Sequence, residues 1–308
     1  MGGCSKRVKI TVICFFLTAA LMQGVFCQFF TRDALERIFP LYVRMVASPV
    51  TCGDKSYTEY YPIRRKSANA DVIAVGIDFS VPGSYLLLCD LITSLKHDAN
   101  IGTVLVDMNC DPVVAGETAV ILDVEDDQEI ERHIQILRDF QAGNKFYYEF
   151  LTSLHQLNQS YPPQRKMAGG IFSARDIQDA GSVLSIAEDY RKQTGRPVLL
   201  ITNTENLSPG SEYLKDARKT ANGCLCIQCL YAEDEWNTSL FSGNSGMYLV
   251  EREKLSFFDD FYALASTDAS GKHPAVRFSE TVSTDIFFVI SRENGNMPVN
   301  SGGNDDPV

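Results

Sequence analysis

The stretch Asp71-Val-Ile-Ala-Val-Gly-Ile-Asp78-Phe-Ser80 decides the fold that this sequence predicts. Its centre, from Val72 to Ile77, is an unbroken apolar run of strand length. A strand with no polar face is buried on both sides, which is typical of the parallel sheets of α/β proteins. The run ends at Asp78, so a carboxylate follows directly after the strand. We therefore predict a buried parallel strand that leads into a polar loop.

Further apolar runs alternate with helical patterns along the chain. After the first strand, leucine and isoleucine residues recur at helical spacing behind Ser84, which is a good N-cap residue. Strands are predicted at Val104–Val106, Ala119–Leu122, Val198–Ile201, Cys224–Leu230 and Met247–Val250. Helices are predicted at Ser84–Leu95, Ile130–Leu137, Phe146–Leu157, Ala174–Gln193, Ser211–Ala221 and Ser256–Ala265. This alternation indicates a mostly parallel sheet with helices on both faces.

One connection is too short for a helical crossover. The segment Asp107–Thr118 contains Pro112 and Gly116 and shows no helical pattern. Because a parallel crossover usually contains a helix, the strand Ala119–Leu122 is predicted to return antiparallel. The predicted fold is α/β: a doubly wound, mostly parallel six-stranded sheet in the order 3-2-1-4-5-6, with one antiparallel edge strand and helices on both faces.

Several of these segments resemble a von Willebrand factor A domain, the integrin I-domain fold. The stretch from Asp71 to Ser80 resembles its first strand and metal-site loop, and Gly169-Gly170-Ile171 resembles its Gly-Gly-Thr loop. Val198–Asn203 resembles the fourth strand, which ends in Asp-Gly in the family, and Ser245–Val250 resembles the last strand. The resemblance spans residues 70–266 and implies a protein-binding domain whose ligand meets loops at the carboxyl edge of the sheet.

The metal site of that family is only partly retained. Mg²⁺ prefers oxygen ligands in octahedral geometry, which the family supplies from an Asp-x-Ser-x-Ser loop, a Thr and a second Asp. Pro82, Ile171 and Asn203 replace three of these ligands. The resemblance therefore implies a degenerate metal site at Asp78, Ser80 and Asn203, with no cofactor expected and Mg²⁺ as the ion it would take. The alternative for Asp78 is a capping or loop-bonding role. The ligand-facing loop residues would be Ser84, Ile171, Ser173 and Thr204.

The first residues predict entry into the secretory pathway. Lys6, Arg7 and Lys9 precede an apolar stretch from Ile10 to Phe26, which is typical of a cleaved signal peptide, and an uncleaved signal anchor is the alternative. No second apolar run of membrane-spanning length follows. The predicted organisation of this secreted, extracellular chain is a signal peptide (1–27), an N-terminal flanking segment (28–69), a von Willebrand A-like domain (70–290) and a disordered tail (291–308).

If the chain enters the secretory pathway, its cysteines are predicted to form disulfides and three of its asparagines to carry glycans. Asn158, Asn206 and Asn237 begin Asn-x-Ser/Thr sequons and are predicted to carry glycans on surface loops. Six cysteines remain after removal of the signal peptide, and an even number indicates disulfides whose pairing stays open. They are Cys52, Cys89, Cys110, Cys224, Cys226 and Cys229.

Charge and motifs together predict a binding protein. The formal net charge of −11 disfavours nucleic acid and anionic membranes as partners. The sequence contains no Gly-x-Ser-x-Gly elbow, His-Glu-x-x-His helix or phosphate-binding loop, and its four histidines share no motif. We therefore predict a non-enzymatic, metal-independent module for extracellular protein–protein interaction or cell adhesion, with an extracellular protein or matrix component as partner. The alternative is a secreted hydrolase or small-molecule receptor on a similar sheet.

Overall fold

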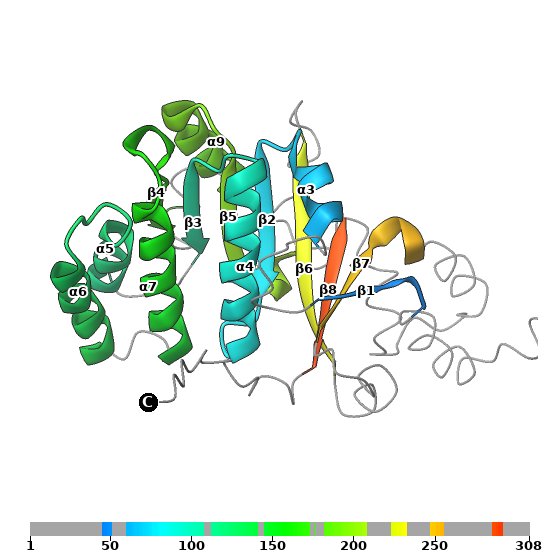
Figure 1. Cartoon of the computed structure of the whole chain (residues 1–308), viewed down its shortest axis with the longest axis horizontal. Coiled ribbons are helices and arrows are strands. Elements are labelled where there is room, and N and C mark those ends of the chain that lie inside the picture. The colour runs from blue at the N-terminus through cyan, green and yellow to red at the C-terminus, as the bar shows by residue number, and fades with distance from the viewer. Residues whose placement is uncertain are drawn as a thin grey trace, which may run out of the picture.

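The apolar run Val72–Ile77 forms an inner strand of an eight-stranded sheet (Figure 1). The structure, a computed structural model, describes residues 45–50, 60–107, 112–140, 145–172, 176, 182–207, 223–232, 247–255 and 285–291. The strands are β1 (Ser48–Pro49), β2 (Val72–Ile77), β3 (Thr103–Asp107), β4 (Ala168–Phe172), β5 (Val198–Asn203), β6 (Cys224–Ala232), β7 (Met247–Glu251) and β8 (Ile286–Ser291). Their order in the sheet is β1-β7-β8-β6-β2-β5-β3-β4.

Helices flank this sheet, and local sequence signals set several of their ends. Side-chain oxygens of Asp126 and Ser182 cap two of them, and Gly195 ends one with a φ of 65°. The helices are α3 (Tyr61–Ser67), α4 (Pro82–Asp98), α5 (Pro112–Val120), α6 (Asp127–Asp139), α7 (Lys145–Gln159) and α9 (Val183–Thr194), and the short 3-10 turns are η2 (Pro163–Arg165), η3 (Thr204–Leu207) and η5 (Arg252–Leu255).

The sheet is mixed, with its antiparallel strands gathered at one border. Strands β4, β3, β5, β2, β6 and β8 pair in parallel. Strand β7 runs antiparallel to β8, and β1 runs antiparallel to β7. The carboxyl ends of the parallel strands therefore lie along one edge of the sheet, the lower edge in Figure 1.

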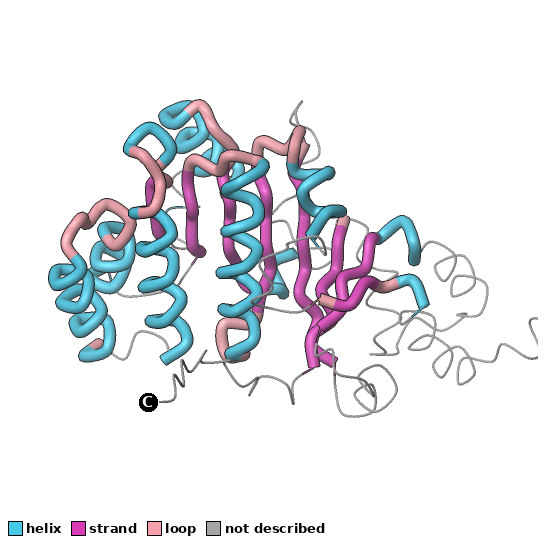
Figure 2. Tube along the Cα trace, in the orientation of Figure 1, coloured by secondary structure: helices cyan, strands magenta, loops and turns pink. Residues whose placement is uncertain are grey.

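Alternate residues of β2 enter two separate hydrophobic cores. Ile73, Val75 and Ile77 belong to the larger core, which includes side chains of α4, α5, α6 and α7. Val72 and Ala74 belong to a smaller core on the other face, closed by α9. Figure 1 shows α4 and α7 in front of the sheet, and Figure 2 shows the strands as one layer behind them. Burial on both faces explains why the run contains no polar residue.

The predicted fold class is confirmed in its coarse form, an α/β sheet that is mostly parallel with helices on both faces, but the six-stranded order 3-2-1-4-5-6 is wrong. Segment Ala119–Leu122, predicted as an antiparallel edge strand, spans the end of α5 and a turn. Pro112 is the first residue of α5, where its missing N–H is harmless, and Gly116 is on an exposed part of the helix. Neither residue marks a loop in this context, and the antiparallel edge lies instead at β7 and β1.

Part of the predicted flanking segment belongs to the same folded unit. Tyr60 and Ile63 are buried in the larger core, and Ser48 of β1 pairs with Leu249 of β7. The boundary predicted at residue 70 therefore falls inside the fold. The signal peptide, the tail after residue 291 and the helices predicted at Ser211–Ala221 and Ser256–Ala265 lie outside the described residues. In the described segments, none of the helices has both the length and the apolar character of a membrane span.

Candidate functional site

The strand order places a topological switch point at the carboxyl ends of β2 and β5. These strands are neighbours, yet the chain leaves β2 toward β3 and leaves β5 toward β6, which lie on opposite sides. Right-handed crossovers in opposite directions pass over opposite faces of a sheet, and ligands of doubly wound folds bind where such connections diverge. Ile77 pairs with Asn203 at this point. We call the segments Asp78–Val81 and Asn203–Leu207, together with Asp107, the carboxyl-edge site.

Asp78 presents one open carboxylate oxygen at this site. Its Oδ1 atom accepts from the backbone nitrogen of Ser80 at 2.8 Å and from the Ser80 hydroxyl at 2.6 Å, a turn that Asp favours after a strand. Its Oδ2 atom has no hydrogen-bond partner in the described segments. Burial raises the pKa of Tyr85, and the negative charge of Asp78 raises it further. The negative charge of Asp78 therefore acts on the Tyr85 hydroxyl in the first turn of α4.

Tyr231 of β6 closes a ring of hydrogen bonds around the Asp78 backbone. Its hydroxyl accepts from the backbone nitrogen of Asp78 at 2.8 Å and lies 2.5 Å from Oγ of Ser84. Ser84 donates to the carbonyl oxygen of Asp78 at 3.0 Å. Because Ser84 has a single proton, the Tyr231 proton must go to Ser84, and each donor of the ring is used. Burial raises the pKa of Tyr231, so the phenol stays protonated.

A second polar cluster holds turn η3 against the end of β3. Oδ2 of Asp107 accepts from the Thr202 hydroxyl at 2.8 Å and from the Asn206 amide at 3.1 Å. The same Asn206 nitrogen donates to the Thr202 hydroxyl at 2.8 Å, which uses both of its protons. Asp107 thus holds Thr202, which precedes η3, and Asn206, which lies within it.

Turn η3 packs closely on β2 because β2 carries a glycine there. A Cβ atom at Gly76 would lie 2.9 Å from Cδ1 of Leu207 and 2.9 Å from Cα of Thr204. The Gln228 amide donates to the carbonyl oxygen of Thr204 at 3.2 Å, and the Thr204 hydroxyl donates to the carbonyl oxygen of Cys229 at 2.8 Å. Both loops of the site are therefore anchored to β6.

The structure brings some of the predicted site residues together and separates others. Asp78, Ser80, Asn203 and Thr204 meet at the carboxyl-edge site. Ser84 was predicted to face the ligand, but it is fully buried because it braces the loop from below. Ile171, with the same prediction, lies within β4 and packs against the larger core, and Ser173 lies outside the described residues.

The residues at this edge do not fit the metal centre that the von Willebrand A resemblance implies. Strands β5 and β3 separate β2 from β4, so at about 4.8 Å per strand Ile171 is roughly 14 Å from β2. The remaining set, Asp78, Ser80 and Asn203, offers a single carboxylate, and Ser80 donates its proton to it. Within the described residues, no group of three or more His, Cys, Asp or Glu side chains is arranged to hold a metal ion.

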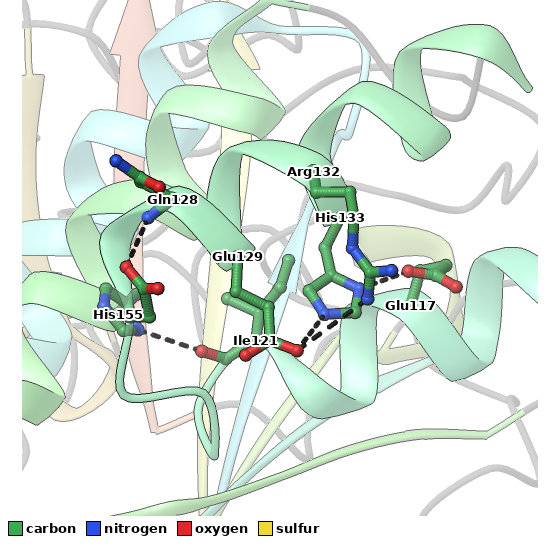
Figure 3. A network of polar contacts seen from close by, with 8 residues as sticks. Glu117, Ile121, Gln128, Glu129, Arg132, His133 and His155 are labelled. Atoms are coloured by element: carbon green, nitrogen blue, oxygen red, sulfur yellow. Dashed lines mark hydrogen bonds and ion pairs between the residues drawn. The ribbon is translucent and has the colours of Figure 1, made fainter.

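Two histidines, His133 and His155, support the packing of helices at the border of the sheet beside β4. Figure 3 shows His133 of α6 turned toward Glu117 of α5, and His155 of α7 turned toward the carbonyl oxygen of Ile121. Nε2 of His133 faces a second carboxylate, that of Glu129, at 4.0 Å. His155 is buried, with Nδ1 at 3.0 Å from the Ile121 oxygen. The contact of His133 with Glu117 thus joins α6 to α5, its contact with Glu129 lies within α6, and both are remote from the carboxyl-edge site.

The predicted disulfides are absent at two of the six positions. Cys89 and Cys224 are free thiols. Cys89 packs against the larger core from α4, where burial raises the pKa of its thiol to about 12. The sulfurs of Cys224 and Cys226 are 3.9 Å apart along β6, far beyond the bond length of about 2.05 Å. Cys229 belongs to the larger core, and Cys52 and Cys110 lie outside the described residues.

Two of the three predicted glycosylation sites do not fit the fold. The side chain of Asn158 is fully buried, and its amide donates to the carbonyl oxygens of Leu122 and Met167 at 3.0 Å each. A glycan on that nitrogen would break both bonds and has no space. The Asn206 nitrogen likewise has both protons committed within the site. Asn237 lies outside the described residues.

The sequence prediction missed Asp107 as a residue of the site, and it missed Tyr231 and Thr202 as side chains that hold the site in place. Asp107 could have been found, because it follows the apolar run Val104–Val106 just as Asp78 follows its strand. Tyr231 carries no such signal, since its role depends on β6 lying beside β2.

Comparisons with known proteins find similarity in fold but not in sequence family. The chain matches no protein-family model and no curated protein. A crystal structure of a Bacillus cereus protein is similar with a TM-score of 0.53 and 7% identity, covering 83% of this chain and 97% of that one. A succinoglycan biosynthesis protein is similar with a TM-score of 0.46 and 10% identity, covering 84% of this chain and 97% of that one. The likeness is one of fold alone.

Proposed function

We propose that this protein is an extracellular binding module that recognises a basic group of a partner protein at the carboxyl-edge site. One observation carries the proposal: the polar side chains there brace the loops, while Oδ2 of Asp78 is left open. Tyr231 and Ser84 hold the first loop, and Asp107 holds the second. Loops fixed before binding lose little entropy on binding, which favours recognition.

The hydroxyl groups at this edge are committed to the fold in a way that favours binding over catalysis. A nucleophilic serine needs a base within hydrogen-bond reach that accepts its proton. Ser84 gives its proton to the carbonyl oxygen of Asp78, and Thr202 gives its proton to Asp107, which also holds Asn206. Ser80 donates to Asp78 from an exposed position. These arrangements stabilise loop shape.

The charge of the chain indicates the chemistry of the partner. The formal net charge of −11 attracts cationic surfaces and disfavours anionic ones. An arginine or lysine of the partner would pair with the open Asp78 oxygen, a charge-assisted hydrogen bond that adds specificity. The predicted signal peptide supports an interaction outside the cell.

The experiment compares the full mature chain with two single-charge variants as baits in extracellular material. Asp78→Asn keeps an oxygen for Ser80 but removes the charge. Asp189→Asn removes the same charge from the exposed surface of α9 and serves as the matched control. A photo-crosslinking residue at the exposed Ser80 position reports which protein touches the site.

The proposal expects a partner that crosslinks at position 80 and is retained by wild type and Asp189→Asn. Its affinity, measured by surface plasmon resonance with the purified partner, should fall about tenfold or more for Asp78→Asn and should weaken with salt. Equal retention by all three chains, with no crosslink at position 80, would refute it.

A further inference from the structure

Of the fourteen Lys and Arg side chains in the described segments, nine form an ion pair with a carboxylate, Arg252 takes part in another interaction, and four form no ion pair. Nine pair with a carboxylate, namely Arg64, Arg65, Lys66, Arg132, Arg138, Lys145, Arg191, Lys192 and Lys254. The four that form no ion pair with any carboxylate are Lys96, Arg165, Lys166 and Arg196. In a chain with a net charge of −11, their lack of acidic partners is unexpected.

These four side chains lie together at the amino ends of β3, β4 and β5. Nζ of Lys96 is 5.2 Å and Cζ of Arg165 is 5.4 Å from the centre of the Tyr161 ring. Nη2 of Arg196 donates to the carbonyl oxygen of Lys166 at 2.6 Å. We call these four residues with Tyr161 the amino-edge cluster. It lies on the edge of the sheet opposite to the carboxyl-edge site, the upper edge in Figure 1.

The cations of the amino-edge cluster repel one another. Burial, together with the charges of Arg196 and Arg165, lowers the pKa of Lys96 to about 7. Burial also lowers the pKa of Arg196, with Arg165 adding to the effect. Like charges held together destabilise a fold unless a counter-charge offsets the repulsion. The described chain supplies none, so an external anion would stabilise this region.

We propose that the amino-edge cluster binds an oxyanion, a phosphate or sulfate group, through the guanidinium groups of Arg165 and Arg196. Arg165 is exposed, and none of its five donors is used in the described segments. Arg196 uses its two Nη atoms for one carbonyl each, at Gln164 and Lys166, and retains three protons. The Arg196 guanidinium donates to the carbonyl oxygens of the two residues that flank Arg165, and the charge of Arg165 acts on it, so the two groups lie near each other. Guanidinium forks suit a tetrahedral oxyanion.

Lys96 should make anion binding at this site take up a proton, which simple screening of surface charge would not do. It is fully buried, donates to the carbonyl oxygen of Ile101 at 2.7 Å and lies over the Tyr161 ring, so it is not exposed to bind a ligand from solvent. An anion nearby favours the charged form of a lysine. Because the pKa of Lys96 is about 7, anion binding at pH 8 should draw a proton onto it.

The test is calorimetric titration of inorganic phosphate and of sulfate into the full mature chain at constant ionic strength. Arg165→Gln is the decisive variant, because the Arg165 guanidinium makes no hydrogen bond within the described segments. Arg138→Gln is the matched control, since Arg138 also lies over a tyrosine ring, 5.5 Å from the centre of Tyr148, but is neutralised by Glu131. A third titration with a heparin-derived sulfated oligosaccharide separates a glycan from a free anion as the source.

The proposal expects saturable binding of an oxyanion that is at least about tenfold weaker in Arg165→Gln and unchanged in Arg138→Gln. Titration at pH 8 in buffers of different ionisation heat should show proton uptake, which Lys96→Met abolishes. Binding of the oligosaccharide alone would assign the site to sulfated glycans, and equal binding of inorganic phosphate would assign it to small anions. Absence of saturable binding, or equal affinities of Arg165→Gln and Arg138→Gln, would overturn the proposal.

Discussion

The hydroxyl oxygens of Tyr231 and Ser84 lie 2.5 Å apart, although 147 positions separate the two residues in the sequence. This contact joins β6 to the first turn of α4. Both hydroxyl groups are also bonded to the backbone of Asp78, one to its N–H and the other to its carbonyl oxygen. The shape of the loop that carries Asp78 therefore depends on a strand formed much later in the chain.

Replacing Tyr231 with phenylalanine should destabilise the fold by about 1–3 kcal/mol. The change removes one hydroxyl, leaves the backbone N–H of Asp78 without its acceptor, and takes the donor away from Ser84. Urea unfolding followed by circular dichroism measures the effect. Tyr61→Phe makes the same change at a tyrosine that is 62% exposed and should leave the midpoint unchanged. Equal midpoints for Tyr231→Phe and wild type would show that the ring does not hold the loop.

Local patterns predicted the individual elements better than their arrangement. Val72–Ile77 and Val198–Ile201 are strands as predicted, because burial on both faces leaves a mark in the sequence itself. Pairing leaves no such mark: nothing in either run shows that β5 lies between β2 and β3. The error at Ala119–Leu122 has a different cause, since a short apolar run at the end of a helix has the same composition as a strand.

Alanine substitutions at Gly76 and Gly116 should have opposite effects. At Gly76 the new Cβ would lie 2.9 Å from the backbone of Thr204, so η3 must shift, at a cost of about 1–3 kcal/mol. At Gly116, within α5, a Cβ meets nothing within 4 Å, and alanine should stabilise the helix by about 0.5–1 kcal/mol. Thermal unfolding of both variants tests this. A stability of Gly76→Ala at or above that of wild type would contradict the close packing of η3.

The sequence predicted a site residue correctly where a local pattern of one residue and its own strand was enough. A carboxylate directly after a buried strand identifies Asp78 without knowledge of its neighbours. Asn206 shows the opposite case, because its sequon indicates a surface glycan while its amide is bonded to Asp107 and Thr202 from neighbouring strands. Sequons and strand ends are local patterns, whereas hydrogen-bond partners depend on the order of the sheet.

Asn158 should carry no glycan and should be intolerant of a negative charge. Asn158→Asp would place a buried carboxylate against the carbonyl oxygens of Leu122 and Met167, at a cost of about 3–5 kcal/mol. Gln156→Glu, on the exposed face of the same helix, makes the equivalent change and should cost little. Peptide mass spectrometry of chain secreted from eukaryotic cells measures occupancy, and urea unfolding measures stability. A glycan found on Asn158 of folded protein would be incompatible with the position of α7.

Lys96 should make the stability of the fold rise with pH above about 7. Its pKa is about 7 in the folded state against an ordinary 10.5, so between these values the unfolded chain binds more protons. Stability then increases with pH, by up to about 1.4 kcal/mol per pH unit, and levels off above the unfolded pKa. Below pH 7 the side chain is charged in both states, and the penalty of burying that charge is fully present.

The measurement is urea unfolding from pH 6 to pH 10 for wild type, Lys96→Met and Lys145→Met. Other groups titrate in this range, so the difference between wild type and Lys96→Met isolates the buried lysine. Lys145→Met removes a lysine that is exposed on α7 and paired with Glu149, and its curve should parallel that of wild type. Parallel curves for wild type and Lys96→Met would mean that Lys96 keeps its ordinary pKa. Since no carboxylate is bonded to it, such a result would require solvent to reach a side chain that the fold fully buries.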